Sequence, residues 1–119
     1  MPQASKPEPA TVVLKAYDFT LWLLPKVETF PRSYRFSVGD RLVGSGLDLL
    51  MILVQCAYTT DKASLLQAAS LKANCLRYLL RLAKDLHLLS LDSYGFSAER
   101  MEEIGRMVGG WQKSLARRA

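Results

Sequence analysis

The sequence predicts an all-α fold, an antiparallel up-down-up-down four-helix bundle. Apolar residues recur at spacings of three and four along most of the chain, which is typical of amphipathic helices. The alternating β-branched runs and Asn-Gly or Asp-Gly turns of hairpins are missing from the sequence. Half of the 119 residues are hydrophobic, enough for one domain with its own core. Short turns separate the four predicted helices, as in a bundle.

The predicted domain covers residues 11–119 and follows a flexible N-terminal tail, residues 1–10. The tail carries three prolines and little that could be buried. It also lacks the apolar run of a signal peptide. The longest apolar run, residues 47–58, is too short to span a bilayer. We therefore expect a cytoplasmic protein that has no membrane partner.

The first helix is predicted over residues 11–30. Pro25 falls inside it and is expected to kink it or to disturb its hydrogen bonds. Pro31 follows its end, where a proline stops a helix. The predicted apolar stripe comprises Val13, Tyr17, Leu21, Leu24 and Val27.

The second helix is predicted over residues 37–59, with Ser37 as its N-cap and Asp40 near its positive end. Three glycines, at positions 39, 44 and 46, weaken its intrinsic helix propensity. They predict a close approach of a neighbouring helix or, alternatively, a flexible first turn.

The third helix is predicted to begin at a cap, Thr60 or Asp61, and to reach residue 89. Residues 90–97 are predicted as a loop, after which Ser97 caps the fourth helix. The apolar stripe of that last helix comprises Met101, Ile104, Val108, Trp111 and Leu115.

The third helix carries two apolar stripes on nearly opposite sides of a helical wheel. One stripe is enough to face a bundle core, so the second needs a cover of its own. The other helices of the same chain are one candidate cover, but another copy of the chain is favoured, which predicts a homo-oligomer. The core stripe comprises Leu66, Ala69, Ala73, Leu76, Leu80 and Ala83. The predicted oligomer interface comprises Leu71, Cys75, Tyr78, Leu82 and Leu86.

Basic residues predict a polyanion, above all nucleic acid, as a partner. The formal net charge is +5. The basic residues of the third helix, Arg77, Arg81 and Lys84, either form a solvated face or, repeated around an oligomer, create a positive electrostatic field. The basic residues near the C-terminus either bind phosphates or interact favourably with the dipole of the last helix. The predicted nucleic-acid-binding residues are Arg32, Arg35 and Arg41, then Arg77, Arg81 and Lys84, and finally Lys113, Arg117 and Arg118.

Two aromatic residues, Tyr34 and Phe36, lie beside the first basic group. They either stack on unpaired bases or pack the junction onto the core. Packing is the favoured interpretation for Phe36.

Catalytic chemistry is not predicted, and neither are a cofactor, a metal ion or a small-molecule substrate. The one histidine, His87, suits the end of a helix. Glu-x-x-His pairs and a glycine-rich phosphate loop do not occur. The cysteines, Cys56 and Cys75, are interpreted as reduced core thiols. Three glutamates near the predicted start of the fourth helix suit its dipole: Glu99, Glu102 and Glu103.

The order YDFTLWLLPKVETFPRSYRFSVGDRL, LRYLLRLAKDL and VGGWQKS resembles the Avd-like four-helix-bundle proteins. These are accessory variability determinants of bacterial and phage diversity-generating retroelements. A related group, encoded in intervening sequences of ribosomal RNA genes, shares the fold. The resemblance covers about residues 14–115. It rests on patterns of apolar, aromatic and basic residues.

The resemblance implies a homopentameric ring that binds a reverse transcriptase and nucleic acid, RNA and also DNA. Arg77 and Arg81 match the two arginines of the family's LR-x-x-LR segment, and Trp111 matches the tryptophan of its last helix. The modest charge and the acids Asp85 and Asp92 depart from a strongly basic member. The predicted function is thus a non-enzymatic accessory protein for mutagenic retrohoming. The alternative is a structural or protein-binding module of the intervening-sequence type, without a reverse transcriptase.

Overall fold

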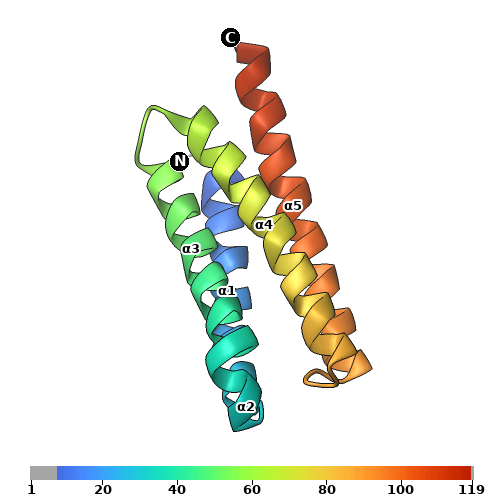
Figure 1. The fold of residues 1–119 in the computed structure, drawn as a ribbon. Coiled ribbons are helices and arrows are strands. Elements are labelled where there is room, and N and C mark those ends of the chain that lie inside the picture. The colour runs from blue at the N-terminus through green and yellow to red at the C-terminus, as the bar shows by residue number, and fades with distance from the viewer. Residues whose placement is uncertain (1–7, 119) are drawn as a thin grey trace.

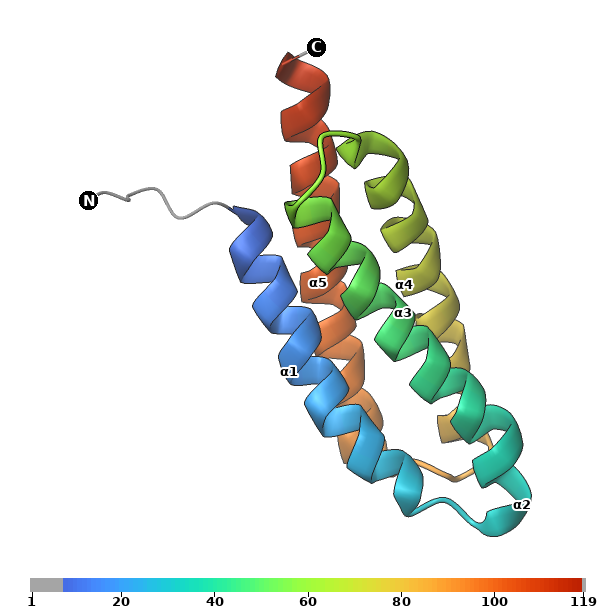
Figure 2. The same ribbon diagram turned by 90° about the vertical axis from the view of Figure 1, so that its left-hand side faces the viewer.

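The computed structural model describes residues 8–118, and within them every secondary-structure element is a helix. The elements are α1 (Glu8–Glu28), α2 (Arg32–Tyr34), η1 (Arg35–Gly39), α3 (Asp40–Ala57), α4 (Lys62–Asp85) and α5 (Leu91–Arg118). The four long helices run alternately up and down (Figure 1). α1 and α4 each pack on α3 and α5, so they occupy diagonal corners of a bundle (Figure 2). The predicted four-helix bundle is confirmed.

The core face of α1 shares only Val27 with the predicted stripe. Tyr17 is 53% exposed and Leu21 is 62% exposed, whereas Val13 and Leu24 are half-buried. The prediction is confirmed for Val27, which is buried, and was wrong for Tyr17 and Leu21, because α1 is apolar on most sides and periodicity alone does not select one face. The helix continues through Pro25. The residues of this segment that are buried in the core are Val12, Ala16, Phe19, Leu23, Val27 and Phe30.

α1 begins at Glu8, three residues before the predicted start. Residues 8–10, the end of the predicted tail, therefore belong to the helix. The rest of that tail, residues 1–7, lies outside the described residues.

After α1 the chain re-enters a helix at Pro31, and the predicted N-cap at Ser37 is wrong. The Pro31 carbonyl accepts hydrogen bonds from the N–H groups of Tyr34 and Arg35, both at 2.9 Å. Proline fixes φ near the helical value and needs no N–H partner, which suits it to a helix start. Ser37 instead lies within the π-helical turn η1, where its hydroxyl donates to the Tyr34 carbonyl at 3.4 Å.

Two of the three glycines allow α1 and the α3 segment to approach closely. A Cβ on Gly39 would lie 2.9 Å from Cγ1 of Val27, and one on Gly46 would lie 2.9 Å from Cδ2 of Leu23. Contacts that short would force the neighbours to move. Gly44 faces open space, so the prediction of close approach is wrong for that position.

Lys62 closes the turn between α3 and α4. Its Nζ donates to the carbonyls of Cys56 and Thr59, both at 2.8 Å, and so satisfies the open end of α3. The same amine lies 5.8 Å from the ring centroid of Trp111 on α5. The predicted start of α4 is confirmed, because Asp61 is its N-cap residue.

The core stripe of α4 is confirmed, since all six of its residues are buried. The helix ends at Asp85, earlier than predicted. His87 adopts a left-handed φ of 63°, and its N–H bonds the carbonyl of Lys84 at 2.9 Å. The N–H of Leu88 bonds the carbonyl of Ala83 at 2.8 Å, which completes a Schellman motif. Leu86 is therefore the half-buried C-cap residue.

α5 begins at Leu91, so the predicted loop over residues 90–97 and the cap at Ser97 are wrong. The hydroxyl oxygen of Ser90 accepts the Ser93 N–H at 3.1 Å and caps the helix. Ser97 is buried and donates to the carbonyl of Tyr94 at 2.8 Å. The core stripe of α5 is confirmed for its buried residues Met101, Ile104, Val108 and Trp111, and Leu115 is partly buried against the core.

Candidate nucleic-acid interface

The nine predicted basic residues fall into three groups that one chain does not bring together. The first group lies at the α2 end of the bundle, and the last group lies on the end of α5 that projects past the α3–α4 connection (Figure 1). The α4 group lies between them along the molecule. The groups are Arg32, Arg35 and Arg41 at the junction, Arg77, Arg81 and Lys84 on α4, and Lys113, Arg117 and Arg118 on α5.

Arg35 is folded back onto the end of α1. Its Nη2 lies 3.4 Å from the Phe30 carbonyl, and its Nε is buried without a hydrogen-bond partner among the described residues. The guanidinium carbon lies 6.0 Å from the ring centroid of Phe36. Phe36 itself is 64% exposed, so the packing interpretation of this residue is wrong. At the junction, Arg32 and Arg41 are the arginines that point into solvent.

A groove runs between α4 and α5, formed by three adjoining shallow hollows that are all lined by Arg77. Nη2 of Arg77 reaches across the groove to within 3.4 Å of the carbonyl oxygen of Met101. Gly105 leaves room for it, because a Cβ there would lie 3.4 Å from Nη2. We call this surface the Arg77 groove, and its polar and aromatic lining residues are Ser70, Asn74, Arg77, Tyr78, Arg81, Tyr94, Glu102 and Arg106.

Two carboxylates partly neutralise the cations in and beside the Arg77 groove. Asp85 lies 3.1 Å from Nζ of Lys84 and 4.0 Å from Nε of Arg81. Glu102 lies 3.8 Å from Nη1 of Arg106. Exposed ion pairs of this kind contribute at most about 1 kcal/mol, so a phosphate can displace a carboxylate. Counted with Arg77, four cations face two carboxylates, and the surface remains positive.

Sequence reasoning missed Tyr94 and Arg106. The segment that contains Tyr94 was assigned to a loop. In the structure Tyr94 lies on α5, and Nζ of Lys84 is 5.0 Å from the centroid of its ring. Arg106 is on α5, one turn after Glu102, and joins the groove only because α5 packs on α4. The i, i+4 spacing of Glu102 and Arg106 was the available signal in the sequence.

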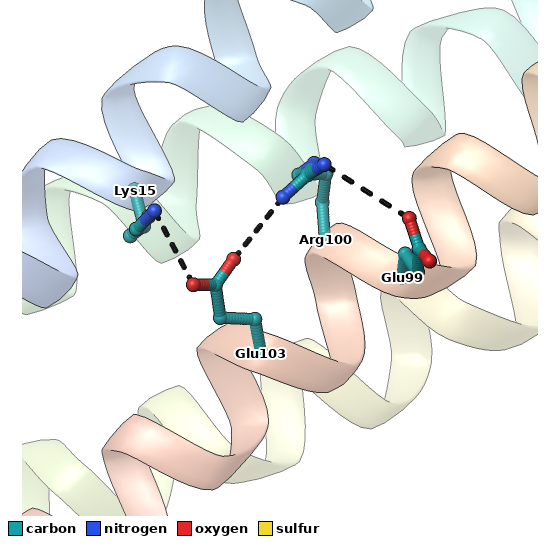
Figure 3. Close-up of polar contacts among 4 residues, drawn as sticks. All are labelled: Lys15, Glu99, Arg100 and Glu103. Carbon is teal, nitrogen blue, oxygen red and sulfur yellow. Dashed lines mark hydrogen bonds and ion pairs between the residues drawn. The ribbon is translucent and has the colours of Figure 1, made fainter.

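The α1–α5 side of the bundle is held by an ion-pair network (Figure 3). Glu103 lies 3.2 Å from Nζ of Lys15 and 3.3 Å from Nη1 of Arg100, and Glu99 lies 3.9 Å from Nη2 of Arg100. The hydrogen bond from Lys15, with further help from Arg100, lowers the pKa of Glu103. Since α5 begins at Leu91, these glutamates lie beyond its first turn, and the helix-dipole interpretation is wrong.

The second apolar stripe of α4 is not covered by the other helices of the chain. Leu71 is 65% exposed and Tyr78 is 72% exposed, and Leu82 and Cys75 are also exposed. Among residues 8–118, coverage by the other helices of the same chain, one of the two alternatives, is therefore wrong. We define the α4 stripe as Leu71, Cys75, Tyr78 and Leu82.

The two cysteines differ in environment. Cys56 is buried, and burial raises the pKa of its thiol although Lys62 lowers it. Cys75 is a free and exposed thiol, so its assignment to the core is wrong. Among residues 8–118, no group of three or more histidine, cysteine or acidic residues is placed to hold a metal ion. Within the same residues, none of the helices has the length and apolarity needed to cross a membrane.

The fold and this groove define a helical-bundle protein with a basic α4–α5 surface. Residues 11–115 match the bAvd-like family, and the chain belongs to that family. The resemblance found in the sequence is thus confirmed. No curated protein matches the chain.

A solved structure shares the fold over nearly the whole chain. It is the crystal structure of a protein of unknown function from the S23 ribosomal protein family of Bacteroides thetaiotaomicron. The TM-score is 0.83 at 16% sequence identity, and the match covers 90% of this chain and 99% of that one. At this identity the likeness shows the fold alone.

Proposed function

We propose that the chain is a non-enzymatic, cytoplasmic accessory protein of a diversity-generating retroelement. In this proposal it binds the element's reverse transcriptase and template nucleic acid and supports mutagenic retrohoming. Membership of the bAvd-like family supports the biological setting. The observation that carries the proposal is the Arg77 groove, where three arginines, with Lys84 beside them, lie next to the ring of Tyr94.

The proposed mechanism is electrostatic. Phosphates of a single strand meet Arg77, Arg81 and Arg106 and displace the weakly held carboxylates. The ring of Tyr94 at the groove edge offers a face on which an unpaired base stacks. RNA is the primary ligand in this proposal, and single-stranded DNA has the same backbone charge.

Homo-oligomerisation raises the charge that a nucleic acid meets. We propose that the α4 stripe is buried against another copy, and that the family's pentameric ring applies here. Five copies would carry about +25 in total. The other exposed cations would then form separate rings of charge at the two ends of the assembly: Arg32 and Arg41 at one end, and Lys113, Arg117 and Arg118 at the other.

Co-purification with a reverse transcriptase tests the partner directly. A tagged chain is expressed together with the reverse transcriptase encoded beside its gene, and the complex is isolated after nuclease treatment. We expect stoichiometric recovery of the enzyme and template-dependent cDNA synthesis that requires the chain. The lack of such a neighbouring gene, or cDNA synthesis that proceeds equally well without the chain, would contradict the proposal.

A second candidate is a protein-binding module of the ribosomal intervening-sequence type. The carboxylates Asp85 and Glu102 favour it, because they offset half of the four positive charges in and beside the groove. An acid-bearing groove suits a protein partner better than a polyanion. The two candidates differ in RNA binding, which the second does not need.

A further inference from the structure

The outward side of α1 is apolar and acidic. Of its residues 11–28, the exposed ones include no lysine or arginine. They are Leu14, Tyr17, Asp18, Leu21, Pro25 and Glu28.

α3 continues this apolar surface. α1 and α3 lie side by side along their length (Figure 2) and run in opposite directions. Leu23 packs on Gly46, and this register places Leu21 near the level of Leu47 and Tyr17 near the level of Met51. We define the α1–α3 face as the exposed large apolar residues of the two helices, Leu14, Tyr17, Leu21, Leu47, Met51 and Tyr58.

The α1–α3 face and the α4 stripe are complementary in charge. Asp18 and Glu28 on α1, together with Asp40 at the start of α3, form no ion pair within residues 8–118. The α4 stripe is bordered by two exposed cations, Arg77, which contacts the Met101 carbonyl, and Arg81, which lies 4.0 Å from Asp85. Because α1 and α4 occupy diagonal corners, the two surfaces point in different directions and one chain cannot close them on each other.

From these observations we infer that the α4 stripe of one copy docks on the α1–α3 face of the next. The contact is heterologous, with two different surfaces per chain, and it repeats from copy to copy until it closes. Pairing of α4 with α4 brings arginines to arginines, and pairing of α1 with α1 brings carboxylates to carboxylates, so both symmetric contacts are disfavoured. The inference rests on the homo-oligomer of the proposed function and specifies how that oligomer is built.

Disulfide mapping tests this contact, since Cys75 is an exposed thiol within the α4 stripe and Cys56 is buried. Single cysteines are introduced at exposed positions of the α1–α3 face, as Tyr17→Cys, Leu21→Cys and Met51→Cys. Glu99→Cys, exposed on α5 outside both surfaces, is the matched control. Each protein is oxidised mildly and separated on a non-reducing gel, with sedimentation of the unoxidised chain in parallel.

We expect at least one face variant to form covalent multimers larger than a dimer, and Cys75→Ser to abolish them. The wild type and Glu99→Cys should stay unlinked. A wild-type dimer linked through Cys75 would overturn the heterologous contact. An oligomer that sediments normally but links in none of the three face variants would overturn the docking alone. A chain that sediments only as a monomer would overturn both the docking and the proposed oligomer, while RNA binding is measured independently.

Discussion

The guanidinium of Arg77 crosses from α4 to α5, and its Nη2 lies 3.4 Å from the backbone carbonyl oxygen of Met101. This contact holds the side chain in the groove. Gly105 has no side chain and leaves space for the guanidinium. A cation fixed in this way loses less conformational entropy when it meets a phosphate.

Gly105→Ala tests whether this placement matters for binding. The new Cβ would lie 3.4 Å from Nη2, at the short limit of ordinary van der Waals contact, so it narrows the space for the guanidinium without a clash. We expect weaker RNA binding, by less than the reduction in Arg77→Ala, as measured by fluorescence anisotropy. Gly109→Ala is the control, since its Cβ meets open space and should leave RNA affinity unchanged. Equal affinities for the two variants would show that the placement of Arg77 is irrelevant.

His87→Gly should stabilise the fold. His87 holds a φ of 63°, a left-handed conformation that costs a residue with a Cβ about 1–2 kcal/mol more than glycine. The gain should be about 1 kcal/mol, because glycine also gains freedom in the unfolded chain. Chemical denaturation followed by circular dichroism measures it. His87→Ala keeps the strain and should show no gain, and a similar gain in both variants would refute the backbone explanation.

The Glu103 network predicts a stability difference that depends on pH. The pKa of Glu103 is lowered, first by the hydrogen bond from Lys15, so its contribution is present above the unfolded pKa of about 4.3 and is lost as pH falls through the folded value. Glu103→Gln should therefore lower Tm at pH 7, and the difference from wild type should shrink as pH falls below about 4.3 and vanish once pH lies below the folded pKa. Glu99→Gln, at the more exposed carboxylate, should change Tm less. A Tm difference that is constant with pH would contradict the ion-pair account.

Tyr78→Asp should dissociate the proposed oligomer without unfolding the chain. The ring is 72% exposed in one chain, so the substitution removes no core packing, yet it places a charge in the middle of the α4 stripe. Sedimentation velocity should show a smaller species at unchanged helical content. Gln67→Asp, exposed on the same helix but outside the stripe, should keep the wild-type size. A Tyr78→Asp chain of unchanged size would place the interface elsewhere.

The helices were predictable from the sequence, whereas their ends and the buried face of α1 were not. The core stripe of α4 was predictable because its alanines and leucines recur at spacings of three and four, with polar residues beside them. On α1, Tyr17 and Leu21 match a helical period as well as the buried Ala16 and Leu23 do. The helix starts were misplaced because Ser37 and Ser97 are good caps by type, while Pro31 and Ser90 have the bonds that start the helices.

The groove was only half predictable, because it depends on the packing of two helices. Arg77 and Arg81 stood out on α4 by their spacing. Their neighbours Tyr94 and Arg106 come from α5, and nothing in a single sequence fixes the register between the helices. Exposure was likewise unpredictable for Phe36, which lies in η1, a turn whose π-helical geometry no simple periodicity describes.

The salt dependence of RNA binding tests the central claim, that the Arg77 groove binds template nucleic acid, most directly. Affinity for a single-stranded template RNA is measured across a range of salt for the wild type and for the Arg77→Ala, Arg81→Ala double variant. Lys26→Ala with Lys72→Ala removes the same charge outside the groove and is the control. We expect steep salt dependence in wild type and control, and in the double variant a slope smaller by about 0.7 for each phosphate that is no longer neutralised. An affinity that is independent of salt, or a double variant with the wild-type slope, would contradict the claim.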